Sequence, residues 1–463
     1  MTMKNKIHFF SILLVIFILG LVSCEKFIEI DKPLDQLTTD EVFADSSTVE
    51  SAILGLYVQQ ITSGTSSFLN GNVTIYPALS SDEIYNTSTS ASFDPFLNNE
   101  LSSTSTLSWT NPYNIIYSCN IILEKLDASS LFPAYKDQAK AEVLFIRALN
   151  YFYLINFYGG VPLALTSDYR VTSKLARNTV ENVYDKIISD LNAAQSTIGS
   201  ANQSTTLRVN KFSISALLAR IYLFTNRYEL ARNESTKVIS SGKFLLPELS
   251  DVFLAGSKEA IMQFVPPNTQ IFGVADAYRF IPSTATARPP FALTESLLTS
   301  FEYGDDRKSK WLKRNTVAGR DYVYPYKYKT RSIPVENTKP EYNIVFRLAE
   351  MYLIRAEANC NLNNYSDAIT DLNKIRKRAF LSELENERVI SKADLFSIIN
   401  HENRIEFFAE WGHRWLDLKR TKQVDLVLQN LKGDKWQKTD ALYPIPLTDI
   451  KQNPNLIQNE GYN

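Results

Sequence analysis

Two distant segments of the chain repeat one short pattern. Ala219–Ala231 and Ala356–Ala368 both have the form Ala…Asn-x-Tyr-x-x-Ala, with identical offsets. In such a pattern an aromatic ring and a small alanine let two antiparallel helices pack closely across a short turn. One helix pair cannot bury its apolar face alone, so several pairs must stack around a continuous core. The repeat therefore predicts a mainly all-α protein built from helix pairs.

The spacing of the repeat resembles the turn and second helix of a tetratricopeptide unit. Apolar residues at helical spacing, and a Gly-Gly-Val-Pro stop after Tyr158, support this architecture. The helices that this spacing predicts are Thr39–Tyr57, Trp109–Leu123, Ala139–Tyr158, Thr179–Ile198, Asn210–Phe224 and Leu395–Trp415.

Two regions interrupt the helical pattern, at about 62–108 and 244–340. The first is dominated by Ser, Thr and Asn, and the second holds Pro266-Pro267 and Pro289-Pro290. We expect both to be variable and loop-rich, the second with a few short strands, and loops of this length are usually functional. The tail 442–455 is expected to be extended, because proline disfavours helix in the residue before it.

The N-terminal segment Met1–Cys24 carries Lys4 and Lys6, followed by the apolar run Phe9–Val22. This order is typical of a secretory signal peptide, and the run is too short for a bilayer-spanning helix. Its ending, Leu-Val-Ser-Cys, resembles a bacterial lipobox, so we expect Cys24 to carry a lipid that holds the protein to a membrane. The expected organisation is a removed signal peptide at 1–23, a lipid-anchored tether at 24–40 and a single helical domain at 41–463.

The charge balance argues against nucleic acid as a partner. The chain has 49 basic and 50 acidic residues, a net charge of −1, whereas phosphate binding depends on clustered Lys and Arg. Cysteine is rare, with three in the chain. Beyond Cys24, Cys119 and Cys360 lie in apolar helical patterns, so we expect buried free thiols, with a disulfide between them as the alternative.

The most charged segment, His401–Arg414, does not fit a metal site. His401-Glu402 begins like the zinc motif H-E-x-x-H, but Ile405 stands where the second His belongs. Glu410 and His413 match one half of a di-iron site, which needs a second such pair and further Glu. We therefore expect neither a metal nor another cofactor.

A structural role explains the charges of this segment better. Glu402 and Glu406 lie four apart and repel each other unless arginines separate them, either Arg404 or an Arg from another helix. Glu410 precedes Arg414 by four residues, the favourable order for an ion pair on one helix. We expect a network of Glu and Arg that fixes helix ends.

No recognised catalytic motif is present. The chain lacks the G-x-S-x-G elbow, the phosphate-binding G-x-x-x-x-G-K loop and the dinucleotide G-x-G-x-x-G loop. The residues therefore identify no catalytic residue of these classes. The carboxylate pair of a glycosidase is defined by its separation in space, so an exported α-helical glycosidase stays an alternative.

In order along the chain, the motifs resemble those of the SusD/RagB family of nutrient-binding outer-membrane lipoproteins. The resemblance covers nearly the whole mature chain, from Cys24 to Tyr462. The segments that carry it are Cys24–Ile28, Thr39–Tyr57, the W-x-x-x-Y-x-x-I-x-x-x-N pattern Trp109–Asn120, Arg147–Leu163, Ala349–Arg376, Glu402–Arg420 and Pro444–Pro446.

This resemblance implies one helical domain that captures ligand at the cell surface and is not an enzyme. Family members work with a SusC-like TonB-dependent transporter, closing over it as a lid and delivering oligosaccharides or peptides. We expect an oligosaccharide here, with a peptide as the alternative in the same family. A tetratricopeptide scaffold that binds protein segments is a third hypothesis.

Sugar sites pair an aromatic ring with hydrogen-bonding side chains, and the two loop-rich regions are the expected source of both. We expect Trp109, which begins a helix, to lie in the core instead. The candidate ligand-binding residues are Tyr76, Asp82, Tyr85 and Phe96 from the first region, and Tyr278, Trp311, Tyr322 and Tyr324 from the second.

Overall fold

The computed structural model describes most of the chain after residue 38. The described residues are Met3, 39–61, 68–104, 109–200, 202, 204–267, 273–332, 340–385 and 391–462. The predicted lipidation site Cys24, with nearly all of the predicted signal peptide and tether, lies outside them. Within the described part of the chain, no helix is both long and apolar enough to cross a bilayer.

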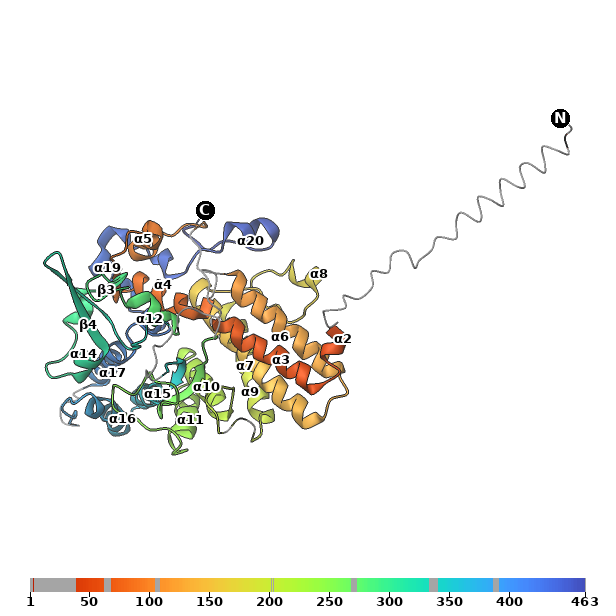
Figure 1. The fold of residues 1–463 in the computed structure, drawn as a ribbon, viewed down its shortest axis with the longest axis horizontal. Coiled ribbons are helices and arrows are strands. Elements are labelled where there is room, and N and C mark those ends of the chain that lie inside the picture. The colour runs from red at the N-terminus through yellow and green to blue at the C-terminus, as the bar shows by residue number, and fades with distance from the viewer. Residues whose placement is uncertain are drawn as a thin grey trace.

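Antiparallel helices packed in sequence order form the body of the protein (Figure 1). Each helix contacts the next in the stack, so the apolar faces merge into one core. The stack consists of α6 (Thr110–Ala128), α7 (Pro133–Tyr158), α9 (Val180–Thr197), α10 (Lys211–Phe224), α11 (Tyr228–Ile239), α15 (Leu348–Asn361) and α16 (Tyr365–Arg378). The prediction of a mainly helical fold is confirmed.

Both copies of the repeated pattern form the same turn between two helices. Asn226, before α11, and Asn363, before α16, adopt the left-handed conformation, with φ of 58° and 65°, which asparagine tolerates better than most residues. The hydroxyl of Tyr228 donates to Asn226 Oδ1 at 2.8 Å, and that of Tyr365 donates to Asn363 Oδ1 at 3.2 Å. The sequence repeat therefore reports a repeated local structure.

Local signals at helix ends act as the sequence predicts. The side chain of Thr179 caps α9 by accepting from the Asn182 amide. Asn210 caps α10 in a reciprocal arrangement with Ser213. Gly159, with φ of 73°, ends α7.

The described residues form three two-stranded antiparallel sheets. The strand pairs are β1 (Ile84–Asn86) with β3 (Phe291–Leu293), β2 (Ala260–Phe264) with β6 (Asn343–Arg347), and β4 (Leu312–Val317) with β5 (Arg320–Pro325). The first pair places Tyr85 opposite Ala292. It therefore joins the two regions that the sequence marks as loop-rich.

The first of these regions is more ordered than expected. Phe68–Asn72 forms a short helical segment, η2, which continues into α4 (Val73–Ser80), and α5 (Asp94–Asn98) follows β1. Nearly all residues from Phe68 to Asp82 are buried. The Ser, Thr and Asn content makes this region look like a loop. Many of these polar side chains are in fact buried and hydrogen-bonded, beside a short run of buried apolar residues.

The expected helix Leu395–Trp415 is two helices, α17 (Lys392–Phe407) and α18 (His413–Arg420). Between them, Ala409, Trp411 and Gly412 have φ of 51°, 47° and 69°. A side chain at Gly412 would lie 2.9 Å from the carbonyl oxygen of Val73 in α4, so the bend requires glycine. Apolar spacing hides the break because Ile405 before it, Trp411 within it and Trp415 after it are all buried.

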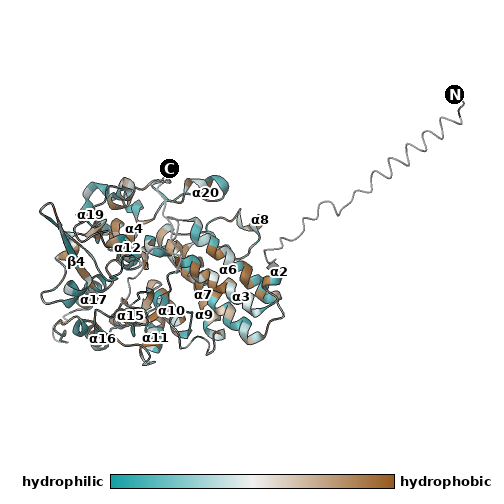
Figure 2. Cartoon of the chain, in the orientation of Figure 1, coloured by the Kyte–Doolittle hydropathy of each residue, from teal (hydrophilic) through white to brown (hydrophobic). Residues whose placement is uncertain are grey.

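The tail also differs from expectation, because residues Leu447–Gln452 form the short helix α20 directly after Pro446. Figure 2 shows hydrophobic residues concentrated on central helices such as α7 and α10, whereas α20 at the rim is mainly hydrophilic. A second apolar cluster joins α15, α16 and α17. Cys119 and Cys360 are buried free thiols, as predicted.

Candidate ligand-binding site

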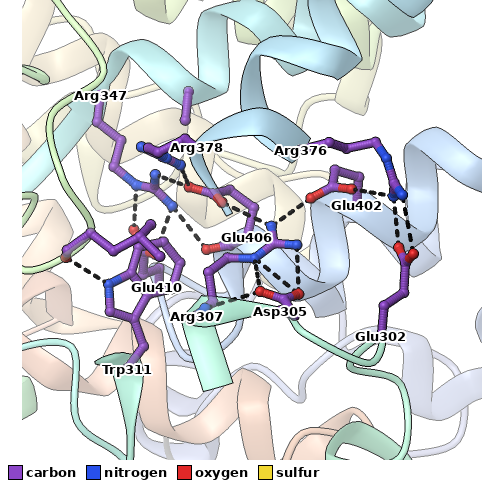
Figure 3. A network of polar contacts seen from close by, with 12 residues as sticks. Glu302, Asp305, Arg307, Trp311, Arg347, Arg376, Arg378, Glu402, Glu406 and Glu410 are labelled. Carbon is purple, nitrogen blue, oxygen red and sulfur yellow. Dashed lines mark hydrogen bonds and ion pairs between the residues drawn. The ribbon is translucent and has the colours of Figure 1, made fainter. Parts of the chain in front are cut away.

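A buried network of ion pairs lies beneath α17 (Figure 3). At its centre the Glu406 carboxylate accepts from Arg307 at 3.0 Å, from Arg347 at 2.5 Å and from Arg378. Burial alone would raise the pKa of Glu406, but the three guanidinium charges outweigh it and hold that pKa well below the usual range. Glu406 is therefore ionised and fully paired.

The other acids of the network are paired in the same way. Glu402 accepts from Arg307 at 2.5 Å and from Arg376 at 3.4 Å. Glu410 accepts from Arg347 at 2.9 Å, and Lys327 also donates to it. We call this set the charge network; its members are Glu259, Glu302, Asp305, Arg307, Lys327, Arg347, Arg376, Arg378, Glu402, Glu406 and Glu410.

The predicted role of Glu and Arg in holding helices together is confirmed, with different partners. Arg404 does not separate the carboxylates of α17; its Nη2 lies 2.7 Å from Asp82. Arg414 also pairs with Asp82, at 2.7 Å, so the expected pair of Glu410 with Arg414 does not form. The bend between α17 and α18 turns these two side chains apart.

The centre of the charge network is closed to a substrate, although Glu302 at its edge is exposed. The side chains of Glu402 and Glu406 are 1% and 0% exposed, and both carboxylates are occupied by arginines. Across the described residues, no group of three or more His, Cys, Asp and Glu side chains is placed to hold a metal ion. The network therefore stabilises the frame.

Five of the eight candidate ligand-binding residues lie in the core: Asp82, Phe96, Trp311, Tyr322 and Tyr324. The Trp311 indole is 0% exposed and donates to the carbonyl oxygen of Leu249 at 2.9 Å. Phe96 packs against Tyr76, with ring centres 4.2 Å apart, and Asp82 holds two arginines. Burial leaves these side chains no open face for a ligand, which corrects the expectation that they meet it at the surface.

The other three candidates, Tyr76, Tyr85 and Tyr278, are half-buried where the two regions meet. Tyr85 lies on β1, and Tyr278 lies on α12 (Ala275–Phe280), which contacts β3. The guanidinium of Arg331 lies 4.3 Å from the centre of the Tyr278 ring. We call this surface the loop junction, and Tyr85 and Tyr278 are its ligand-binding candidates.

A cleft of about 270 Å³ lies elsewhere, between α6 and the C-terminal segment. We call it the aromatic cleft. The described residues that line it are Trp109, Thr110, Tyr113, Tyr117, Asn120, Pro162, Ala164, Thr166, Thr172, Ser173, Asp449, Gln452, Asn453 and Leu456.

Three aromatic rings at successive four-residue intervals form one wall of this cleft. Trp109 packs against Tyr113 at 5.1 Å and edge-on against Tyr158 at 4.9 Å. The Tyr113 hydroxyl donates to the carbonyl oxygen of Pro162 at 2.9 Å. Tyr117 is 48% exposed. Trp109 and Tyr113 are thus held in place by their contacts, whereas the ring of Tyr117 is accessible to a ligand.

The opposite wall supplies polar groups from α20 and the residues after it. Asn453 is fixed by donating to the carbonyl oxygen of Leu175 at 2.8 Å and by accepting from the Asn455 amide at 3.0 Å. Asp449 is half-buried, and none of the described cations forms an ion pair with it. Burial raises the pKa of Asp449. The Asp449 carboxylate accepts from the Thr448 hydroxyl at 3.1 Å and has acceptor capacity left. Aromatic rings together with a carboxylate that lacks an ion pair suit a ligand with apolar faces and many hydroxyls, such as a sugar.

Sequence reasoning did not find Tyr117 or Asp449 as candidates. Trp109 was expected in the core and is buried there, yet it is also the base of the cleft. The available signal was the aromatic row Trp109, Tyr113, Tyr117, because a four-residue spacing drifts around a helix and carries the last ring towards solvent. Asp449 gave no signal, since only the fold places α20 beside α6.

Two further clefts are lined differently. One, of about 330 Å³, lies between α17 and α18 and includes Arg404, Arg414 and Asp417. The other, of about 700 Å³, includes Phe212 and Lys243. The second of these clefts also has aromatic lining, from Phe212, Phe244 and Tyr342, but its rings are buried or half-buried, whereas Tyr117 of the aromatic cleft is 48% exposed.

The stacked helix pairs, with short strand pairs between them, define a helical protein of tetratricopeptide-like architecture. The chain belongs to the SusD family. A family profile described as starch-binding and associating with the outer membrane matches residues 26–223, and a profile of the SusD family matches residues 294–462.

Relatives and solved structures agree with this assignment. A SusD-like protein of Formosa agariphila is 27% identical, with 98% of each chain covered, and the starch-binding protein SusD of Bacteroides thetaiotaomicron is 25% identical, with 70% of this chain and 72% of that one covered. A SusD superfamily protein of Bacteroides vulgatus has the same fold, with a TM-score of 0.78, 19% identity and 90% and 99% of the two chains covered. A laminarin-binding SusD-like protein matches with a TM-score of 0.75, 21% identity and coverage of 91% and 100%.

Proposed function

We propose that this protein is a cell-surface lipoprotein of the outer membrane that binds an oligosaccharide and delivers it to a SusC-like TonB-dependent transporter, over which it closes as a lid. Membership of the SusD family supports this function, and two of the relatives are named for starch or laminarin binding. The observation that carries the sugar assignment is the aromatic cleft, whose lining includes both the exposed Tyr117 ring and the carboxylate of Asp449.

The dimensions and chemistry of the aromatic cleft fit the end of a sugar chain. Its volume of about 270 Å³ is near the lower end of ordinary ligand pockets, which begin at about 300 Å³. Tyr117 offers a ring for the apolar face of a pyranose, while Asp449 and Gln452 offer acceptors and donors for its hydroxyls. Tyr117 lies on α6, and Asp449 and Gln452 lie on α20, so the backbone of each group is already ordered before binding.

The lining of the cleft favours binding over hydrolysis. A glycosidase uses two carboxyl groups about 5 to 9.5 Å apart across the scissile bond. Asp449 is the single carboxylate among the described residues that line the aromatic cleft. This observation favours a binding protein over a glycosidase. Incubation of the purified protein with oligosaccharides tests this conclusion. Hydrolysis of a sugar would show that the protein is a glycosidase after all.

Calorimetry with laminarin and maltose oligosaccharides, and with unrelated peptides, tests the ligand class. We expect a sugar to bind, and we expect Tyr117→Ala and Asp449→Asn each to weaken binding about tenfold, equivalent to about 1.4 kcal/mol. The matched control is Tyr169→Ala, because Tyr169 is 74% exposed on α8 (Tyr169–Thr172) and does not line the cleft.

Other outcomes of this experiment have defined meanings. Loss of sugar binding in Tyr85→Ala or Tyr278→Ala, with Tyr117→Ala unchanged, would move the site to the loop junction. Binding of peptides in place of sugars would identify a peptide-binding member of the family or a tetratricopeptide scaffold.

Two measurements test the membrane and transporter parts of the proposal. Cys24→Ala should abolish lipid labelling and release the protein from membranes. Purification from outer membranes in gentle detergent should recover a large β-barrel transporter, and repeated failure to do so would remove the partner from the proposal.

A further inference from the structure

Two lysine side chains lie over one tyrosine ring beside the β4–β5 hairpin, and a third lysine contacts one of them through its backbone. The Nζ atoms of Lys313 and Lys329 lie 4.7 Å and 4.2 Å from the centre of the Tyr326 ring. The Lys329 ammonium also donates to the carbonyl oxygen of Lys310 at 2.6 Å and to that of Tyr326. We call Lys310, Lys313, Lys329 and Tyr326 the lysine cluster. Lys310 and Lys313 are exposed, and the other two are half-buried.

Negative charge near the lysine cluster is scarce. None of its three ammonium groups forms an ion pair with a described carboxylate, whereas the neighbouring Arg314 pairs with Asp321 at 3.0 Å. Glu341 is the acid that faces Lys329, but its carboxylate accepts from the backbone amides of Lys329 and Thr330, at 2.7 and 3.0 Å. The acid that acts on Lys329 is therefore already held by two backbone amides.

The electrostatic cost of this arrangement is visible at Lys329. Burial lowers the pKa of Lys329 to about 8; Glu341 opposes this shift, and the charges of Lys313 and Lys310 add to it. Bringing like charges together without compensation is unfavourable, and a bound anion would relieve it.

The strand geometry leaves this cluster open at the surface. On β5, Tyr322 and Tyr324 lie opposite Asn315 and Lys313, so these four side chains share one face of the hairpin. Asn315, opposite Tyr322, donates to the carbonyl oxygen of Ala287 at 2.8 Å. The segment that contains Ala287 therefore contacts this end of the hairpin. Tyr326, beyond the end of β5, stays half-exposed with its lysines.

We propose that the lysine cluster binds an anionic substituent, a sulfate or a carboxylate, carried by the sugar chain. The ammonium groups of Lys313 and Lys329, both close to one aromatic ring, offer charge-assisted donors to an anion. This inference rests on the proposed glycan binding and adds the substrate class: acidic sugar chains, with the hairpin as a second contact outside the aromatic cleft.

Matched polymers that differ in charge alone provide the test. Binding of the full mature protein to oligosaccharides of dextran, carboxymethyl dextran and dextran sulfate is measured by calorimetry at low and high salt. We expect the two charged forms to bind at least tenfold more tightly than dextran, with the advantage shrinking at high salt because exposed charges are screened. Comparing the carboxymethyl and sulfate forms tells which anion the cluster prefers.

Lys313→Met and Lys310→Met should each reduce the preference for the charged polymers severalfold. The control is Lys308→Met, since Lys308 is exposed on the same helix, α14 (Asp306–Trp311), but is not part of the cluster. Lys329→Met should reduce the preference in the same way. An unfolding curve unchanged from that of the parent protein shows that Lys313→Met and Lys310→Met are folded.

An equal loss in Lys308→Met, or no loss in the cluster variants, would overturn the inference by showing that the attraction is diffuse. Tight binding of laminarin with no preference for charged polymers would also overturn it, while leaving the proposed function intact. Failure of every sugar to bind would instead overturn the proposed function.

Discussion

The charge network and the aromatic cleft use similar side chains for opposite purposes. In the network, Glu406 faces three arginines and is sealed from water. In the cleft, Asp449 is half-buried and lacks an ion pair with any described residue. A carboxylate that is paired and buried holds helices together, whereas one that is left unpaired beside aromatic rings can be used by a ligand. Whether a carboxylate is paired with arginines, more than its residue type, therefore separates the structural network from the candidate binding site.

The largest expected effect comes from breaking the network at Arg347. Arg347→Met removes the bonds to Glu259, Glu406 and Glu410 at once and leaves buried carboxylates without their partner. We expect the free energy of unfolding to fall by about 3–5 kcal/mol, as for other broken buried pairs. Urea unfolding measures this loss.

Under conditions in which Arg347→Met is still folded, its affinity for sugar should equal that of the parent protein. A loss of stability below about 1 kcal/mol would show that the network contributes little. A loss of affinity at unchanged stability would contradict the separation of frame from site.

A second prediction uses a buried acid that has no ion pair with a described cation. Glu83, beside Asp82, is buried, and this burial, with the charge of Asp82, raises its pKa from 4.5 to about 8. Between these values the folded state holds a proton that the unfolded state has lost, so the contribution of Glu83 to stability falls as pH rises from about 4.5 to 8. Glu406 has the opposite sign, because its lowered pKa makes its contribution present above its ordinary value and lost in acid.

Glu83→Gln should therefore unfold less readily than the parent protein at pH 8, by about 1–3 kcal/mol, with a smaller difference at pH 5. Urea unfolding at the two pH values gives the comparison. The same difference at both would mean that Glu83 does not change its protonation on folding.

The smallest effect on stability is expected in the aromatic cleft. Tyr117→Ala removes a ring that is 48% exposed, so unfolding should shift by no more than about 0.5–1 kcal/mol, while sugar affinity falls. The two variants therefore test the separation of frame from site from both sides. Arg347→Met should change mainly stability, and Tyr117→Ala should change mainly sugar affinity. Large destabilisation by Tyr117→Ala would mean that the cleft is part of the frame.

Local sequence signals predicted much of the helical frame. The caps Thr179 and Asn210 and the stop at Gly159 are contacts within a few residues, so they can be read from the chain. The repeated asparagine turn is local for the same reason. Membership of Glu402 and Glu406 in a network with arginines was also predictable, because their spacing makes them repel without counter-charges.

The features that sequence did not reveal depend on contacts between distant segments. Arg307 and Arg347 reach the network from a short helix and a strand end, with no local pattern to identify them. Trp311 was a ligand candidate because its region looks loop-rich, yet its indole is sealed beneath Leu249. The break after α17 was hidden because apolar spacing continues through it, and the approach of α4 to Gly412 appears only in three dimensions.

The order in which the chain is made gives the charge network another consequence. Arg307, Arg347 and Arg378 precede Glu402–Glu410 along the chain, so a truncated protein that ends before α17 contains these arginines without most of their acids. Such a fragment has almost all of the helix pairs but cannot bury their guanidinium groups without a large penalty. We therefore expect a chain that ends before α17 to be digested by proteases faster than the full-length protein, because its core cannot close around unpaired arginines.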